Sequence, residues 1–248
     1  MNKKIGIFDS GLGGLSILKE LVKLLPNEDY LFYEDSINNP YGEKSDEELL
    51  EITSKIVDYL LKENCKIIVI ACNTATTSCI EKLRNKYPNT IFVGTVPAIK
   101  VAYDNNYKNT IILSTTYTRN SKRVNELISE YHNTFQNIIN ISGENLANLI
   151  EENKMDEVNN LLERLLTPYK NCDSVVLGCT HYSLIKDEIK RVLPNATLID
   201  GNIGVAKEVK HQLEINSSIS NSKNSGEITF INTKDSKLIE RSFELLRK

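Results

Sequence analysis

The chain has 248 residues, of which 40% are hydrophobic and 25% are charged, and its formal net charge is −3. This length supports one large domain or two modest ones, and the composition is that of an ordinary soluble globular protein. No basic cluster is longer than a pair, which argues against nucleic acid as the main partner. No apolar run approaches the roughly 18 residues of a membrane span, and the first apolar run is too short for a signal peptide.

The N-terminal stretch predicts a buried strand, a glycine-rich turn and a helix. Residues 5–8 are apolar, residues 9–14 read Asp-Ser-Gly-Leu-Gly-Gly, and leucines recur at helical spacing over residues 15–25. The glycines do not match the GxGxxG dinucleotide fingerprint, and Asp9 would oppose a pyrophosphate. We interpret them as allowing close backbone approach to a small ligand, with a plain tight turn as the alternative. Asp9, at a strand end, is a candidate proton handler.

The next stretch predicts a second strand, a loop and a second helix. The strand covers residues 30–33, and the loop after it contains proline and glycine as breakers. Tyr41 and Gly42 in this loop either line a pocket or belong to an ordinary exposed loop. Ser45 and Glu48 form a capping box that opens the helix.

The two halves of the chain contain a repeated cysteine pattern. Residues 65–72 and 172–179 each begin and end with a cysteine around an apolar run, and corresponding cysteines are 107 residues apart (172 − 65 and 179 − 72). Each copy predicts a buried parallel strand, a turn and a helix. Cys72 and Cys179 would then lie at strand ends and helix N-termini, where α/β sheets bind ligands and thiol pKa values fall. The remaining cysteines are interpreted as small buried hydrophobic side chains: Cys65, Cys79 and Cys172.

Further apolar runs complete an alternation of strands and helices. Strands are expected over residues 90–93, 110–113, 138–141, 197–199 and 227–232, and the last helix over residues 238–246. The alternation implies right-handed βαβ units and mainly parallel sheets. Residues 216–226 are rich in Ser and Asn and are predicted to form a flexible loop. The last strand and helix are expected to pack on the first half of the chain.

Two thiols in one cleft have three possible uses: a catalytic disulfide, one nucleophile with a bystander, or two acid/base groups on opposite faces of one carbon. Redox pairs are usually local in sequence, whereas these cysteines are 107 residues apart. Inversion of a stereocentre by proton transfer needs a base on one face and an acid on the other, and reversibility requires the same kind of group on both. The duplication favours this third interpretation.

The number and spacing of the cysteines and histidines also indicate whether the chain binds a metal and in which cellular compartment it resides. The chain contains neither CxxC nor HExxH, so we predict no metal site. Its five cysteines are an odd number without tight spacing, which predicts free thiols in the cytoplasm rather than a disulfide framework.

Four motifs, in order along the chain, resemble the glutamate racemases of the cofactor-independent aspartate/glutamate racemase superfamily. They are Phe-Asp-Ser-Gly-Leu-Gly-Gly at residues 8–14, Pro-Tyr-Gly-Glu-Lys at 40–44, Ala-Cys-Asn-Thr-Ala-Thr at 71–76 and Gly-Cys-Thr-His-Tyr at 178–182. The resemblance implies an α/β fold with two similar domains, pseudo-symmetric by duplication. Each domain would be a mainly parallel sheet flanked by helices, with the active site between them. The expected domains are residues 1–97 plus 207–248 and residues 98–206.

The resemblance implies interconversion of L-glutamate and D-glutamate for peptidoglycan synthesis, without pyridoxal phosphate, metal or another cofactor. It assigns catalytic roles to Cys72, Cys179, Asp9, His181 and Glu151. Asp9 would assist Cys72, and His181 would assist Cys179. The residues implied to bind the substrate are Asp9, Ser10, Tyr41, Gly42, Asn73, Thr74, Thr118, Thr180 and His181. We also expect a homodimer, with neither nucleic acid nor a membrane as a partner.

Two segments depart from the family pattern, namely residues 114–118, with Tyr117 in place of a glycine, and residues 141–145. Both departures are expected to affect the shape of the substrate pocket and, through it, the choice of substrate. The alternatives are a racemase for aspartate or another amino acid, a non-catalytic binding module for acidic amino acids, and a redox switch. The motifs bring no arginine and only Lys44 nearby, so N–H groups and hydroxyls are expected to hold the substrate carboxylates.

Overall fold

The computed structural model describes residues 3–131, 137–235 and 237–247. These residues form two compact units, each with its own sheet. The first unit comprises Met1–Thr95 together with Asn202–Lys248, and the second comprises Val96–Gly201. The chain therefore leaves the first unit once and returns to it for its last stretch.

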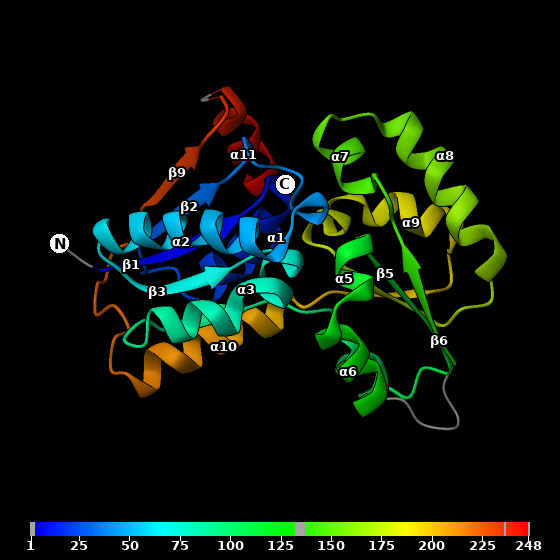
Figure 1. The fold of residues 1–248 in the computed structure, drawn as a ribbon, viewed down its shortest axis with the longest axis horizontal. Coiled ribbons are helices and arrows are strands. Elements are labelled where there is room, and N and C mark those ends of the chain that lie inside the picture. Colours follow the sequence, from blue (N-terminus) through cyan, green and yellow to red (C-terminus); the bar gives the residue numbers. More distant parts are fainter. Residues whose placement is uncertain (1–2, 132–136, 236, 248) are drawn as a thin grey trace. The chain divides into compact units, whose positions relative to one another are not determined.

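The first unit is built on a five-stranded sheet in the order β4-β3-β1-β2-β9 (Figure 1). Its strands are β1 (Lys4–Asp9), β2 (Tyr30–Glu34), β3 (Cys65–Ile70), β4 (Phe92–Gly94) and β9 (Ile228–Asn232). All neighbouring strands run parallel. The central strands β1 and β3 are almost entirely buried, as continuous apolar runs of a doubly covered parallel sheet should be.

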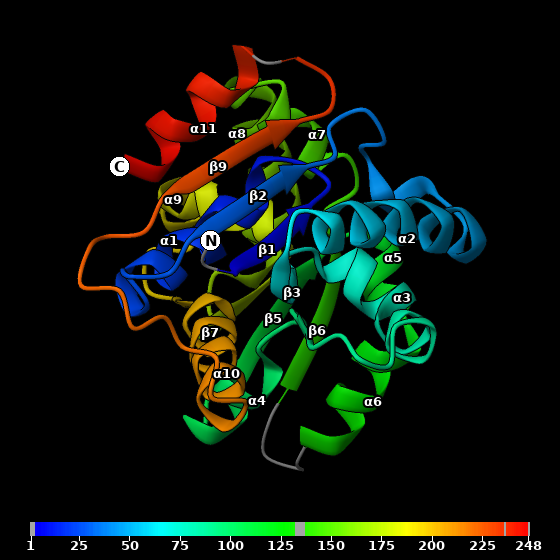
Figure 2. The same cartoon turned by 90° about the vertical axis from the view of Figure 1, so that its left-hand side faces the viewer.

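Helices cover both faces of this sheet (Figure 2). They are α1 (Leu15–Leu24), α10 (Asn202–Ile215) and α11 (Lys237–Arg247) on one face, and α2 (Asp46–Lys62) and α3 (Asn73–Lys86) on the other. Two 3₁₀ turns, η1 (Leu12–Gly14) and η2 (Tyr41–Glu43), follow β1 and β2. The predicted capping box is confirmed, because the Ser45 hydroxyl accepts from the Glu48 N–H while the Glu48 carboxylate accepts from the Ser45 N–H.

The second unit is built on a four-stranded parallel sheet in the order β6-β5-β7-β8. Its strands are β5 (Asn109–Ser114), β6 (Asn137–Ser142), β7 (Ser174–Gly178) and β8 (Thr197–Ile199). Side chains alternate between the two faces along each strand. Ile111 and Val175 therefore pack into one core, whereas Ile112 and Val176 pack into the other.

Each core of the second unit is closed by its own set of helices. One core involves α4 (Ile99–Asp104) and α6 (Lys122–Tyr131), with α5 (Thr116–Asn120) beside α6. The other involves α7 (Leu146–Glu151), α8 (Met155–Leu166), α9 (Lys186–Val192) and the 3₁₀ segments η3 (Thr167–Tyr169) and η4 (Thr180–Ile185). The second sheet is thus covered on both faces, like the first.

The two sheets share one topology. Strands β4-β3-β1-β2 of the first unit stand in the same order as β8-β7-β5-β6 of the second, and β9 is an extra edge strand in the first unit. The predicted α/β class, with two similar parallel units related by duplication, is confirmed. The last strand and helix return to the first unit as expected, because β9 pairs with β2.

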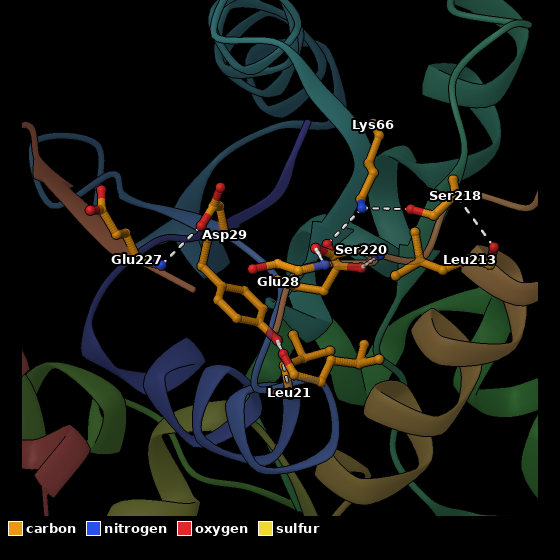
Figure 3. Close-up of polar contacts among 11 residues, drawn as sticks. Leu21, Glu28, Asp29, Lys66, Leu213, Ser218, Ser220 and Glu227 are labelled. Atoms are coloured by element: carbon orange, nitrogen blue, oxygen red, sulfur yellow. Dashed lines mark hydrogen bonds and ion pairs between the residues drawn. The ribbon is translucent and has the colours of Figure 1, made fainter. Parts of the chain in front are cut away.

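Residues 216–226, which connect α10 to β9, form no helix or strand, as predicted. Hydrogen bonds join them to the rest of the first unit. The buried ammonium of Lys66 lies 2.6 Å from a Glu28 carboxylate oxygen and donates to the Ser218 carbonyl oxygen at 2.6 Å (Figure 3). The second Glu28 oxygen accepts from the Ser220 N–H at 2.7 Å. A buried ion pair therefore fastens this segment to the sheet.

Two details differ from the expected layout. The expected domain boundary at residue 206 falls inside α10, a single helix that lies wholly in the first unit. The second cysteine copy continues as the 3₁₀ segment η4 before α9 begins, whereas the first copy continues directly as the α-helix α3. Among the described helices, none is long and apolar enough to cross a membrane.

Candidate active site

Cys72 lies at the carboxyl edge of the first sheet. Strand β3 ends at Ile70, α3 begins at Asn73, and Cys72 is the residue that caps this helix. Its side chain is buried, with 6% exposure. Strand β1 is the parallel neighbour of β3, so its last residue, Asp9, lies at the same edge of the sheet. The Ala71 N–H donates to the Phe8 carbonyl oxygen at 2.8 Å. The sheet thus brings a thiol and a carboxylate to adjacent strand ends.

The glycine-rich turn after β1 fixes the Asp9 carboxylate. One carboxylate oxygen accepts from the Ser10 N–H at 2.7 Å, and the other accepts from the Gly14 N–H at 2.5 Å. A Cβ atom on Gly14 would lie 2.8 Å from the Asp9 Cβ and 3.1 Å from the Ala71 Cβ. A glycine is therefore required at position 14 because the turn packs directly against Asp9.

Tyr41 and Gly42 belong to η2, which follows β2. The Tyr41 side chain is fully buried, so the alternative of an ordinary exposed loop is excluded for this residue. Burial raises the pKa of the Tyr41 phenol well above its ordinary value, and the negative charges of Asp35, Cys72 and Asp9 add to this effect. Tyr41 therefore lies within electrostatic reach of both candidate proton handlers in this unit.

Three more of the expected substrate-binding residues lie in the same unit. Asn73 and Thr74 are the first two residues of α3, Ser10 follows β1, and all three are buried. Among the described residues, no hydrogen-bond donor reaches the buried Oδ1 atom of Asn73. A buried acceptor without a donor is costly, so Asn73 is equipped to receive a donor from a ligand.

Cys179 occupies the equivalent place in the second unit. Strand β7 ends at Gly178, and Cys179 precedes η4. The side chain is buried, with 7% exposure. Its sulfur lies 3.7 Å from the His181 Nδ1 atom. The strand-end position is thus kept, and an imidazole lies beside this thiol.

His181 links Cys179 to Glu151. Its Nε2 atom makes a short contact with a Glu151 carboxylate oxygen at the end of α7. Burial alone would lower the pKa of the imidazole, but the Glu151 charge and the Cys179 hydrogen bond outweigh burial and raise this pKa well above its ordinary value. His181 therefore lies between the Cys179 sulfur and the Glu151 carboxylate, and these two neighbours favour its protonated form.

We expect Glu151→Gln to destabilise the protein in a pH-dependent way. A histidine whose folded-state pKa is raised adds stability that is fully present below its unfolded pKa of about 6.5 and is lost as the pH rises through the folded value. The loss should be about 1.5–3 kcal/mol near pH 6 and should shrink at higher pH. Urea unfolding between pH 6 and 9 measures it, with the exposed neighbour variant Glu152→Gln as control. A loss that does not change with pH would contradict the ion pair.

The remaining expected residues lie near the same edge of the second sheet. Thr180 is the first residue of η4. Thr118 lies in α5, directly after β5, and its N–H donates to the Thr115 hydroxyl at 3.1 Å. The structure also joins the two departing segments, because the Thr116 and Ser142 hydroxyls lie 2.7 Å apart. These segments therefore form one local structure near the carboxyl ends of β5 and β6.

The other cysteines behave as buried hydrophobic side chains. Burial raises the pKa of Cys65 to about 12 and also raises those of Cys79 and Cys172, so these thiols are poor nucleophiles and bases near neutral pH. Across residues 3–131, 137–235 and 237–247, no group of three or more His, Cys, Asp or Glu side chains is arranged to hold a metal ion.

Two residues near the thiols were not singled out from the sequence. Asp35 follows β2 and accepts from the Tyr41 hydroxyl at 2.7 Å. Tyr182, next to His181, is buried and donates to the Gly143 carbonyl oxygen at 3.1 Å. A Cβ atom on Gly143 would lie 2.5 Å from the Tyr182 hydroxyl oxygen. Asp35 had a usable signal, because it directly follows the strand next to β1, which ends at Asp9, whereas the Tyr182–Gly143 contact had none.

The fold and the paired thiols define a class of protein. Two parallel α/β units of one topology each present a cysteine at an equivalent strand end, and residues 18–209 match the family model described as Asp/Glu/Hydantoin racemase. The chain belongs to this family and is an isomerase.

Within the family, relatives that are 36–41% identical are named glutamate racemases, which confirms the resemblance seen in the motifs. The glutamate racemase of Clostridium botulinum is 40% identical over 252 residues, covering 99% of this chain and 97% of that protein. The crystal structure of the Francisella tularensis glutamate racemase in complex with D-glutamate has a TM-score of 0.84 and 27% identity, covering 100% of this chain and 94% of that chain. The Escherichia coli enzyme in complex with L-glutamate and the activator UDP-MurNAc-Ala has a TM-score of 0.84 and 29% identity, covering 98% and 96%.

Proposed function

We propose that this chain interconverts L-glutamate and D-glutamate, with Cys72 and Cys179 as the two acid/base groups. The observation that carries the proposal is the equivalence of the two thiols. Each follows a corresponding strand of the duplicated sheets, β3 or β7. His181 lies beside Cys179, and Asp9 ends β1, the strand next to β3. The similarity to proteins named glutamate racemases supports glutamate as the substrate.

The proposed reaction moves one proton at a time. A cysteine thiolate removes the α-proton of one enantiomer, and the electron pair of the C–H bond remains on the α-carbon, where the adjacent carboxylate delocalises it. The thiol of the other cysteine then gives a proton to the opposite face. The two cysteines exchange protonation states, and the reverse reaction uses them in the opposite order. A thiol suits both roles because its unperturbed pKa is about 8.5, near the working pH.

The two thiols receive different help in this proposal. The His181 imidazolium, held by Glu151, places a positive charge and a proton donor beside the Cys179 sulfur. Asp9 ends the strand next to β3 and is fixed by two backbone N–H groups, and it is proposed to assist Cys72.

Substrate binding is proposed to use neutral polar groups. The unsatisfied Asn73 Oδ1 acceptor suits the substrate ammonium, which can donate three hydrogen bonds. Hydroxyls and N–H groups suit the two carboxylates, and the proposed donors are Ser10, Thr74, Thr118, Thr180 and the backbone N–H groups of the η2 residues Tyr41 and Gly42. The proposal also includes a role in peptidoglycan synthesis, a cytoplasmic location, which the five free cysteines support, and a homodimer.

The decisive experiment follows glutamate in deuterium oxide. We expect each pure enantiomer to lose its optical activity and to gain one deuterium at the α-carbon, as read by circular dichroism and mass spectrometry. No added cofactor should be required. Aspartate serves as the matched substrate, because it carries the same charges on a chain shorter by one methylene. Binding of glutamate without exchange would contradict the proposal and indicate a binding module, and faster turnover of aspartate would contradict the substrate.

A further inference from the structure

Asp35 is a buried carboxylate that the proposed reaction leaves without a role. Asp35 follows the last residue of β2 and is only 2% exposed. Its N–H donates to the Asp9 carbonyl oxygen at 2.9 Å. Asp35 thus lies at the same sheet edge as Asp9, on the neighbouring strand, and begins the loop that leads to η2.

The Asp35 carboxylate is held by neutral donors. One oxygen accepts from the Tyr41 hydroxyl at 2.7 Å and from the Asn38 amide at 2.9 Å. The other accepts from the Asn38 amide at 3.0 Å and from the Thr233 hydroxyl at 3.3 Å. A buried charge without a cation depends on such donors. The shortest of these hydrogen bonds is the one from the Tyr41 hydroxyl, so Asp35 holds the Tyr41 side chain in place.

The contact with Asp35 determines what the Tyr41 phenol can do. A phenol has one proton to donate, and here the proton is directed to Asp35. The raised pKa of Tyr41 keeps that proton in place across the working pH range. The ring cannot rotate away without leaving the Asp35 carboxylate short of a donor, so the η2 turn is fixed where it packs on α3, the helix that follows Cys72.

The C-terminal strand contributes to the same arrangement. Thr233, just after β9, donates its hydroxyl proton to Asp35 and accepts from the Ile37 N–H at 3.0 Å. Its own N–H donates to the Glu34 carbonyl oxygen at 3.1 Å. The loop between β2 and η2 is therefore fixed both by Asp35 within it and by a residue almost 200 positions later.

We propose that Asp35 is a positioning residue for glutamate binding, which holds the Tyr41 phenol and thereby the η2 turn against Cys72. This inference rests on the proposed function, and it assigns Asp35 no proton transfer of its own. Its hydrogen bonds go to Tyr41, Asn38 and Thr233, so its effect on the substrate passes through the turn that carries Tyr41 and Gly42.

The first test separates KM from kcat. Asp35→Ala should raise KM for both enantiomers by about tenfold or more, because a charge-assisted hydrogen bond is lost, while kcat changes by less than about threefold. Asp35→Asn keeps an oxygen that accepts from the Tyr41 hydroxyl and should recover most of the loss. The exposed carboxylate of Glu47, on α2, provides the control variant Glu47→Ala, which should leave KM unchanged.

The second test does not require racemisation. Iodoacetamide labelling, followed residue by residue by peptide mass spectrometry, should speed up several-fold at Cys72 in Asp35→Ala. Labelling of Cys179, which belongs to the other unit, should stay at the wild-type rate and serves as the internal control. If the wild-type protein fails to racemise glutamate, the proposed function fails, yet the labelling still decides whether Asp35 holds the turn.

Three outcomes would overturn the inference. A fall in kcat with unchanged KM and a lost limb of the pH–rate profile would make Asp35 an acid or base. A lower melting temperature with unchanged KM and unchanged Cys72 labelling would leave it a purely structural residue. If Asp35→Ala does not fold, Tyr41→Phe removes the same hydrogen bond from its other side. Wild-type KM and wild-type labelling in Tyr41→Phe would then reject the inference.

Discussion

Replacing either Cys72 or Cys179 with alanine is expected to abolish racemisation while leaving the fold intact. Each thiol is proposed to serve one face of the α-carbon, so one alanine removes either the base or the acid in each direction. Positioned acid/base groups contribute about 10²–10⁴-fold each, so the rate should fall by at least about 10²-fold. Both side chains are small and nearly buried, and circular dichroism should show wild-type secondary structure.

The single variants also have a directional signature. Each keeps one thiol, which can still remove and return a proton on its own face. In deuterium oxide, Cys72→Ala and Cys179→Ala should therefore exchange the α-proton of opposite enantiomers, without inversion. Cys65→Ala and Cys172→Ala are the matched controls, because Cys65 is the first residue of β3 and Cys172 lies just before β7, and both variants should racemise glutamate normally. Interconversion of both enantiomers by either Cys72→Ala or Cys179→Ala would reject the two-thiol mechanism.

Lys66→Met is expected to destabilise the first unit by about 3–5 kcal/mol, the usual effect of breaking a buried ion pair by removing one partner. The side chains of Lys66 and Glu28 are only 8% and 2% exposed, and the substitution would leave the Glu28 carboxylate with the Ser220 N–H but without its cation. The Ser218 carbonyl oxygen would lose its donor as well. Urea unfolding at neutral pH measures the effect, and glutamate turnover at low denaturant shows whether the native fold is kept.

The exposed pair of Lys55 and Glu51 provides the control for this experiment. Their side chains are 73% and 70% exposed at an N–O distance of 2.7 Å, so Lys55→Met should cost less than about 1 kcal/mol. Adding Glu28→Gln to Lys66→Met should recover part of the stability, because a neutral amide is less costly to bury than an unpaired carboxylate. Equal losses for Lys66→Met and Lys55→Met would show that the buried pair does not fasten residues 216–226.

The local elements followed from the sequence because their signals are local. Continuous apolar runs over residues 67–70 and 175–177 predict strands covered on both faces, and both runs lie in strands that are almost entirely buried, β3 and β7. The Ser45 capping box placed the start of α2. The spacing of 107 residues between Cys72 and Cys179 predicted two equivalent strand ends, and the shared strand order of the sheets accounts for it.

The partners of the charged side chains were decided only by the tertiary structure. Glu151 meets His181 across 30 residues, and Lys66 meets Glu28 across 38. Asp35 and Thr233 meet across 198 residues, because β2 and β9 are neighbours in the sheet. Hydrophobic period and capping residues are properties of neighbours along the chain, so the sequence by itself determined the elements and the paired thiols. Which carboxylate faces which donor depends on how strand ends are placed side by side, and that placement exists only once the sheets have formed.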